Sequence, residues 1–250
     1  MKIMAIGAHP DDVEFMCAGT LFLLRRAGCD VHIATFTAGD NGSVERGPEE
    51  IAEIRRGEAA RAADMLDADY TCLEERDCRV WAGDESVMKA VEAMRRVEPD
   101  VVFTHYPEDY MVDHEEASRI VRAATFSAPI PNYSTGAENP APPLDGIPHL
   151  YYWEPMEGKD IFGRPVDPGF HVDITDTVER KKEMLACHDS QRSWLLEQHG
   201  VDEYLNTMME HAERAGDRVD VEYAEGFTQH RGHAYPADQV LKKHIAEALL

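Results

Sequence analysis

The chain alternates between short apolar runs and longer segments whose apolar residues recur at helical spacing. The short runs are residues 3–8, 31–37, 70–73 and 101–104, and the helical segments are 13–27, 49–66, 85–97 and 115–125. Short apolar runs predict buried strands, whereas apolar positions three or four residues apart predict helices. The alternating order predicts an α/β fold, a three-layer sandwich around a mostly parallel, Rossmann-like sheet.

The pattern changes in the second half of the chain. Residues 127–148 are rich in proline and glycine and too long for an ordinary connector, so we expect an ordered loop or a lid there. Beyond it, the pattern predicts strands at 150–153 and 170–174 and helices at 176–188, 194–214 and 238–250. We expect one domain over residues 1–250, with the proline-rich stretch as an irregular insertion.

Composition and charge narrow the class of protein. The chain has 250 residues, of which 43% are hydrophobic and 29% charged, which is typical of a globular core. The formal net charge of −23 argues against nucleic acid or an anionic membrane as a partner, because such surfaces require clustered positive charge. A small molecule is the expected partner.

Two further features concern location. No apolar run approaches the roughly 18–20 residues that a membrane span requires, and charged residues follow the first apolar run at once. The five cysteines are scattered and never spaced as C-x-x-C, which is typical of a reduced compartment. The sequence therefore predicts a cytoplasmic protein.

The segment His9-Pro10-Asp11-Asp12 lies where the first predicted strand ends and the first helix begins. Ligands of open parallel sheets bind at the carboxyl ends of the strands, and imidazole and carboxylate are ordinary zinc ligands. His9 and Asp12, three residues apart around a turn, are candidates for one ion. Either aspartate could instead simply cap the helix, but a capping role would explain neither the second aspartate nor His9.

The fourth predicted strand supplies a second cluster. It leads through His105 and Tyr106 to Asp113 and His114 at the start of the next helix. Parallel neighbours bring strand ends together, so His114 can complete a set with His9 and Asp12. Three protein ligands leave one position open for water, which marks a catalytic zinc site. The same carboxylates argue against a nucleotide site, since they would repel phosphates and no Gly-x-Gly-x-x-Gly is present.

These motifs resemble those of the LmbE/PIG-L-like zinc N-deacetylases. The resemblance rests on His-Pro-Asp-Asp after the first strand, on Arg55-x-x-Glu58 in the second helix and on Asp113-His114 after the fourth strand. It extends weakly into the second half, over residues 181–191 and 222–227. The resemblance is also compatible with a homo-oligomer.

The resemblance implies a zinc-dependent hydrolase that removes an acetyl group from an N-acetylated amino sugar or sugar conjugate. His9, Asp12 and His114 would hold Zn²⁺, with Asp113 behind them. Asp11 would be the general base acting on a metal-bound water, the nucleophile. Arg55 would lie near the substrate.

One position departs from the family pattern. Many members carry a histidine three residues before the last ligand, where it helps to stabilise the oxyanion, and here that residue is Met111. The candidates to replace it are His105, Tyr106, Tyr110 and a C-terminal segment; we also expect His105, Tyr106, His230 and His233 to line the substrate site. The alternative is a catalytically inactive, metal-containing binding or regulatory protein of the same fold.

Overall fold

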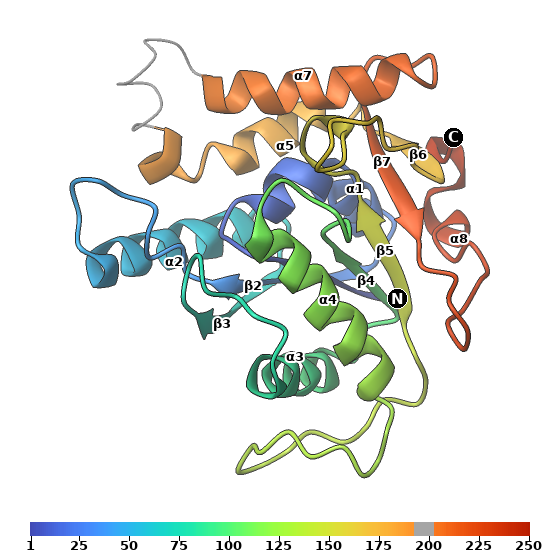
Figure 1. Ribbon diagram of the computed structural model, residues 1–250. Helices are drawn as coiled ribbons and strands as arrows, with labels where there is room; N and C mark the ends of the chain where they lie inside the picture. The colour runs from blue at the N-terminus through green and yellow to red at the C-terminus, as the bar shows by residue number, and fades with distance from the viewer. Residues whose placement is uncertain (193–202) are drawn as a thin grey trace.

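Both halves of the chain contribute strands to one seven-stranded sheet (Figure 1). The structure is a computed structural model that describes residues 1–192 and 203–250. The strands are β1 (Lys2–Gly7), β2 (Asp30–Thr37), β3 (Asp69–Glu75), β4 (Val101–Thr104), β5 (His149–Trp153), β6 (Phe170–Asp173) and β7 (Ala224–Gln229). Their order across the sheet is β3-β2-β1-β4-β5-β7-β6.

The sheet is mostly parallel, as the sequence predicts. β3, β2, β1, β4 and β5 pair in parallel, and β7 runs antiparallel to both of its neighbours, β5 and β6. The chain builds outward from β1 to β3 and then returns to place β4 on the other side of β1. The strand order therefore reverses between β1 and β4, which is the point where open α/β sheets bind their ligands.

Helices cover both faces of the sheet, which confirms the three-layer sandwich (Figure 1). One core contains residues of α1, α2, α5 and α7, and the core on the opposite face contains residues of α3 and α4. The longer helices are α1 (Asp12–Arg26), α2 (Pro48–Asp64), α3 (Asp84–Val97), α4 (Val112–Ser127), α5 (Val178–Leu185) and α7 (Glu203–Asp217). The short ones are η1 (Met156–Gly158), α8 (Lys242–Ile245) and η2 (Ala246–Ala248).

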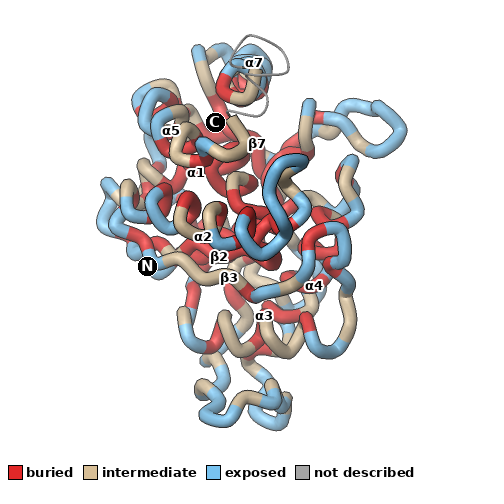
Figure 2. The backbone as a smooth tube through the Cα atoms, turned by 90° about the vertical axis from the view of Figure 1, so that its left-hand side faces the viewer, coloured by how far each residue is buried: buried red, intermediate tan, exposed pale blue. Residues whose placement is uncertain are grey.

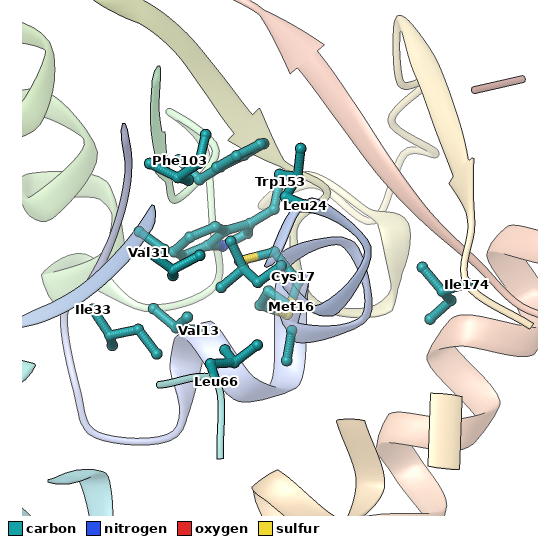
Figure 3. Close-up of a cluster of buried hydrophobic side chains, with 14 of the residues drawn as sticks. Val13, Met16, Cys17, Leu24, Val31, Ile33, Leu66, Phe103, Trp153 and Ile174 are labelled. Atoms are coloured by element: carbon teal, nitrogen blue, oxygen red, sulfur yellow. The ribbon is translucent and has the colours of Figure 1, made fainter. Parts of the chain in front are cut away.

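Alternating side chains of the strands separate the two cores, because successive residues of a strand point to opposite faces. Phe103 and Trp153 face α1, whereas their neighbours Val102 and Tyr152 face the opposite core. Figure 3 shows Trp153 among the side chains of the α1 side, with Met16 close to it. These large aromatic side chains thus fill the core between the sheet and α1.

Helix α1 is buried along most of its length, so its exposed surface is small (Figure 2). It lies between the sheet and helices α5 and α7, which pack against it from outside. A helix enclosed in this way is apolar nearly all round. The residues at its first turn are therefore held in a fixed position relative to the sheet.

The second half differs from the prediction in two places. Strand β7 was not predicted, and the expected helix 238–250 is reduced to α8 and the turn η2. Leu250 instead exchanges backbone hydrogen bonds with His171 of β6. Part of the expected helix 194–214 lies outside the described residues.

The proline-rich segment is an ordered loop between α4 and β5. Residues 128–148 contain no helix or strand. The guanidinium group of Arg95 holds the start of this loop by donating to the carbonyl oxygens of Ala128, Ile130 and Tyr133. No helix in the described part of the chain is long and apolar enough to cross a membrane.

Candidate metal centre and active site

The site lies at the carboxyl ends of β1 and β4, where the strand order reverses. The turn that follows β1 brings Asp12 close to the strand, because a Cβ atom on Gly7 would lie only 2.7 Å from the Cβ of Asp12. A glycine at that position therefore allows the turn to fold back on β1. The loop after β4 brings His114, at the start of α4, to the same place.

His9, Asp12 and His114 form a buried group whose ligand atoms lie within 4.8 Å of one another. His9 Nδ1 is 3.6 Å from Asp12 Oδ2, and His114 Nε2 is 3.4 Å from Asp12 Oδ1. Two imidazoles and one carboxylate that converge on one point fit a zinc ion and leave a coordination position for water or substrate. The predicted ligand set is brought together.

A carboxylate lies close to the ring nitrogen of each histidine that does not face Asp12. His9 Nε2 lies 3.1 Å from Asp77 Oδ1 and 3.3 Å from Asp113 Oδ2, and His114 Nδ1 lies 3.0 Å from Asp109 Oδ1. A carboxylate that accepts a hydrogen bond from one ring nitrogen orients the ring so that its other nitrogen faces the ion. His9 would thus bind through Nδ1 and His114 through Nε2.

Asp12 is fixed on the side away from His114. Its Oδ2 atom accepts a hydrogen bond from the backbone N–H of His9 at 2.7 Å and lies 3.0 Å from Nε2 of His105. Its Oδ1 atom is the one that faces His114. Both carboxylate oxygens are therefore placed before any ion binds.

The electrostatics of the group favour a bound cation. Burial lowers the pKa of His114, but Asp12 and Asp109 outweigh burial and raise it to about 9. Burial also lowers the pKa of His9, yet hydrogen bonds to Asp113, Asp12 and Asp77 raise it well above its ordinary value. Such a field of carboxylates holds protons on the imidazoles in the absence of metal, and a divalent cation replaces those protons.

Asp11 lies beside the ligand group without belonging to it. Its backbone is left-handed, with φ 103°, and its carbonyl oxygen accepts the N–H of Phe15 in the first turn of α1. Its Oδ2 atom accepts a hydrogen bond from the Tyr204 hydroxyl at 2.7 Å and lies 3.4 Å from Arg55 Nη2. Burial raises the pKa of Asp11, and Arg55 opposes that rise.

A cavity of about 280 Å³ opens beside these residues. One end is polar and contains Asp11, Asp12, His105, Asp109 and His114. The remaining lining residues come from α1, β5, η1, α7 and the loop before α4, and they are Phe15, Met16, Tyr110, Trp153, Met156, Glu203, Tyr204 and Thr207. The cavity thus joins reactive groups to a largely apolar wall.

The candidate metal ligands lie in a segment that is similar to a known protein family. Residues 4–125 match the family described as PIG-L, GlcNAc-PI de-N-acetylase, and this range contains His9, Asp12 and His114. The first half of the chain is therefore similar to the PIG-L family.

The most similar proteins include enzymes of two reaction types. A diacetylchitobiose deacetylase of Thermococcus kodakarensis is 27% identical over 203 residues, covering 76% of this chain and 70% of that protein. A 4-oxalmesaconate hydratase of Pseudomonas putida is 24% identical over 196 residues, covering 75% of this chain and 73% of that protein.

Among solved structures, the N,N'-diacetylchitobiose deacetylase of Pyrococcus horikoshii superimposes with a TM-score of 0.78 at 25% identity. The superposition covers 94% of this chain and 86% of that one. A likeness of this extent includes the second half of the chain, beyond the residues that match the family.

Arg55 contacts the turn that carries Asp11 from outside the cavity. Its side chain is buried and does not line the cavity; Nη2 donates to the carbonyl oxygen of Pro10 at 2.8 Å, and Nη1 donates to that of Gly39. A Cβ atom on Gly39 would overlap the guanidinium group. The structure thus gives Arg55 contacts to the turn that carries Asp11.

The other residues expected near the substrate divide into two groups. His105 lines the cavity, where its ring stacks on that of His114 at a centroid distance of 4.0 Å. Tyr106 and His230 both contact Tyr152, on the other face of the sheet, and neither lines the cavity. His233 is exposed and also lies outside the cavity lining.

Met111 precedes α4 and does not line the cavity, whereas its neighbour Tyr110 does. The Tyr110 ring meets the His114 ring edge-on at a centroid distance of 5.3 Å. Burial, reinforced by Asp12 and Asp109, raises the pKa of Tyr110, so its phenol keeps its proton. Of the four candidates to replace the missing histidine, His105 and Tyr110 lie in the cavity.

Sequence reasoning missed Asp77, Asp109 and Tyr204. Asp77 follows β3, so the rule that ligands gather at the carboxyl ends of strands could have found it. Asp109 lies in the loop after β4 and was open to the same argument. No such signal indicates Tyr204, because it lies on a helix 193 positions after Asp11 in the sequence.

Proposed function

We propose that the protein is a zinc-dependent N-deacetylase acting on a neutral N-acetylated amino sugar or sugar conjugate. The convergence of His9, Asp12 and His114 carries this proposal, together with the cavity that Asp12 and His114 line beside Asp11. The relative from Thermococcus kodakarensis, named a diacetylchitobiose deacetylase, supports the reaction class.

Different residues would carry out the different steps of amide hydrolysis. His9, Asp12 and His114 would hold a zinc ion, which would supply a Lewis acid to polarise the carbonyl group and to lower the pKa of water. Asp11 accepts a proton as water adds to the carbonyl carbon, and it delivers that proton to the nitrogen as the C–N bond breaks. The products are acetate and the free amine.

Tyr110 is the donor that we assign to the oxyanion. Its phenol keeps its proton, and its ring meets the ring of His114 edge-on at the cavity wall. A hydrogen-bond donor aimed at the developing negative charge contributes roughly 10²–10³-fold to such reactions. Tyr110 would then take the role of the histidine that many family members carry at the position of Met111.

A second candidate function is hydration of a carbon–carbon double bond, because the chain also resembles a 4-oxalmesaconate hydratase. The charge of the cavity argues against such a substrate. Among the described lining residues, four are aspartate or glutamate and none is lysine or arginine. A substrate with several carboxylates would be repelled there, whereas a neutral amide would not.

The two functions are separated by assaying the zinc-loaded protein on both substrate classes. We expect about one zinc ion per chain and release of acetate from N-acetylglucosamine glycosides, with no loss of the ultraviolet absorbance of 4-oxalmesaconate. Turnover of 4-oxalmesaconate alone would establish the hydratase. Zinc retention without either reaction would favour the inactive binding protein.

The change Asp11→Asn tests the general base. We expect kcat to fall by about 10²–10⁴-fold, because the amide side chain cannot accept the proton. Zinc content, measured by atomic emission, should stay unchanged because Asp11 is not a ligand. The exposed Asp217→Asn on α7 serves as the control, and retained turnover in Asp11→Asn would exclude this role.

A further inference from the structure

Helix α7 brings a phenol to the carboxylate of Asp11. The Tyr204 hydroxyl donates to Asp11 Oδ2 at 2.7 Å, across 193 positions of sequence. Tyr204 lies at the start of α7, and its side chain also lines the cavity. This contact joins the second half of the chain to the turn that follows β1.

The contacts to the Asp11 carboxylate converge on one of its two oxygens. Arg55 Nη2 lies 3.4 Å from the same Oδ2 atom that accepts the Tyr204 hydrogen bond. Arg55 is itself held by the carbonyl oxygens of Pro10 and Gly39. With Oδ2 engaged from two sides, rotation of the carboxylate is restricted, and among the contacts of the described residues Oδ1 is the oxygen left to exchange a proton.

We infer that Tyr204 is a positioning residue that orients the carboxylate of Asp11 for proton transfer. The inference rests on the proposed deacetylase function, in which Asp11 is the general base. It assigns a role in the active site to a helix outside residues 4–125, the part of the chain that matches the family.

The chemistry of the contact supports donation by the phenol. Burial and the neighbouring Asp11 raise the pKa of Tyr204 well above its ordinary value, so the hydroxyl keeps its proton. The last torsion of an aspartate side chain is broad, so a carboxylate without such a donor samples many orientations. Since misplacement of a catalytic group by 1 Å can reduce a rate by about 10²-fold, loss of the donor should slow the reaction.

The change Tyr204→Phe tests the inference, because it removes the hydroxyl and keeps the ring. We expect kcat on an N-acetylglucosamine glycoside to fall by about 10- to 100-fold, with KM changed less than about 3-fold and zinc content unchanged. Tyr223→Phe, at a half-buried tyrosine that packs against the same core, should keep the wild-type kcat.

A double variant separates positioning from a general structural role. If Tyr204 acts through Asp11, Tyr204→Phe should slow an Asp11→Asn enzyme by much less than it slows the wild type. Equal slowing in both backgrounds would overturn the inference, as would a rise in KM with kcat unchanged or full activity of Tyr204→Phe. A wild-type protein that releases no acetate would instead overturn the proposed function.

Discussion

At the scale of single residues, each candidate metal ligand is held by at least one neighbour on the side away from the ion. His9 is oriented by Asp77 and Asp113, and His114 is oriented by Asp109. These partners come from the ends of β3 and β4 and from the start of α4. The site is therefore already arranged in the folded chain, so an ion binds without a large rearrangement.

Asp77 provides the sharpest test of this arrangement. Although burial raises the pKa of Asp77, hydrogen bonding to His9 lowers it to about 2, so the carboxylate is charged at neutral pH. We expect Asp77→Asn to weaken zinc binding by about 10- to 100-fold, because an uncharged neighbour makes His9 a poorer ligand.

Competition with a chromophoric chelator measures this affinity. The exposed Asp217→Asn should bind zinc as tightly as the wild type does, since it lies away from the site on α7. Unaltered affinity in Asp77→Asn would mean that Asp113 alone orients His9.

At the scale of elements, the first half follows from local sequence more closely than the second. The strands and helices up to α4 are regular, and the ligand set lies at the ends of adjacent parallel strands, where the topology alone places it. Strand β7 was missed because it contains Glu225 and Gly226, which strands disfavour. It is formed by pairing with β5 on one side and β6 on the other.

Within the site, too, the residues that could be predicted are those whose position follows from local sequence. His9, Asp12 and His114 could be chosen because a strand end fixes where they lie. Asp77 follows a strand end and was open to the same argument, whereas the role of Tyr204 depends on a contact across 193 positions, which no local pattern encodes. Arg55 was expected at the substrate, but the structure directs its guanidinium group to backbone oxygens of two loops.

A buried ion pair joins three of the elements on one face. Lys181 of α5 lies 2.6 Å from Glu225 of β7, and both side chains are almost completely buried. The Glu225 carboxylate also accepts the backbone N–H groups of Gly19 and Thr20 in α1. Glu225 therefore satisfies buried donors on two helices at once.

Removing this carboxylate should destabilise the fold strongly. We expect Glu225→Ala to lower the free energy of unfolding by about 3–5 kcal/mol, because it leaves the Lys181 ammonium buried without its counter-charge. Urea unfolding followed by circular dichroism measures the change. The exposed Glu222→Ala should keep the wild-type midpoint, and an equal midpoint for Glu225→Ala would contradict the assigned role of the pair.

At the scale of the whole molecule, the excess of acidic residues extends into the cavity. The formal net charge is −23, and four carboxylates of the described residues line the candidate active site. A surface of this sign repels polyanions in general, so selection against them begins before a substrate reaches the cavity. The overall charge and the local charge thus favour the same class of neutral substrate.

One buried histidine, His211, should contribute to the loss of stability in acid. Burial, together with Lys181, Arg214 and Arg218, lowers the pKa of His211 in α7 to about 3. An unfolded histidine titrates near 6.5, so between these values the unfolded chain binds the extra proton. Stability is therefore lost as the pH falls from about 6.5 towards 3.

The change His211→Gln should reduce this loss. Between pH 7 and pH 5 the wild type should lose about 2 kcal/mol more of its free energy of unfolding than the variant does. Urea titrations at both pH values measure the difference, with the exposed His233→Gln as the control. Equal losses in the wild type and in His211→Gln would show that His211 does not govern acid stability.

The wall of the cavity has a practical consequence for changing what the enzyme accepts. Met156 in η1 and Thr207 in α7 line the cavity, yet neither belongs to the ligand group or contacts its carboxylates in the described part of the chain. A mutant library confined to these two codons could reshape the pocket for bulkier amides while leaving the reactive end intact. Laboratory evolution of new substrate scope would best start there.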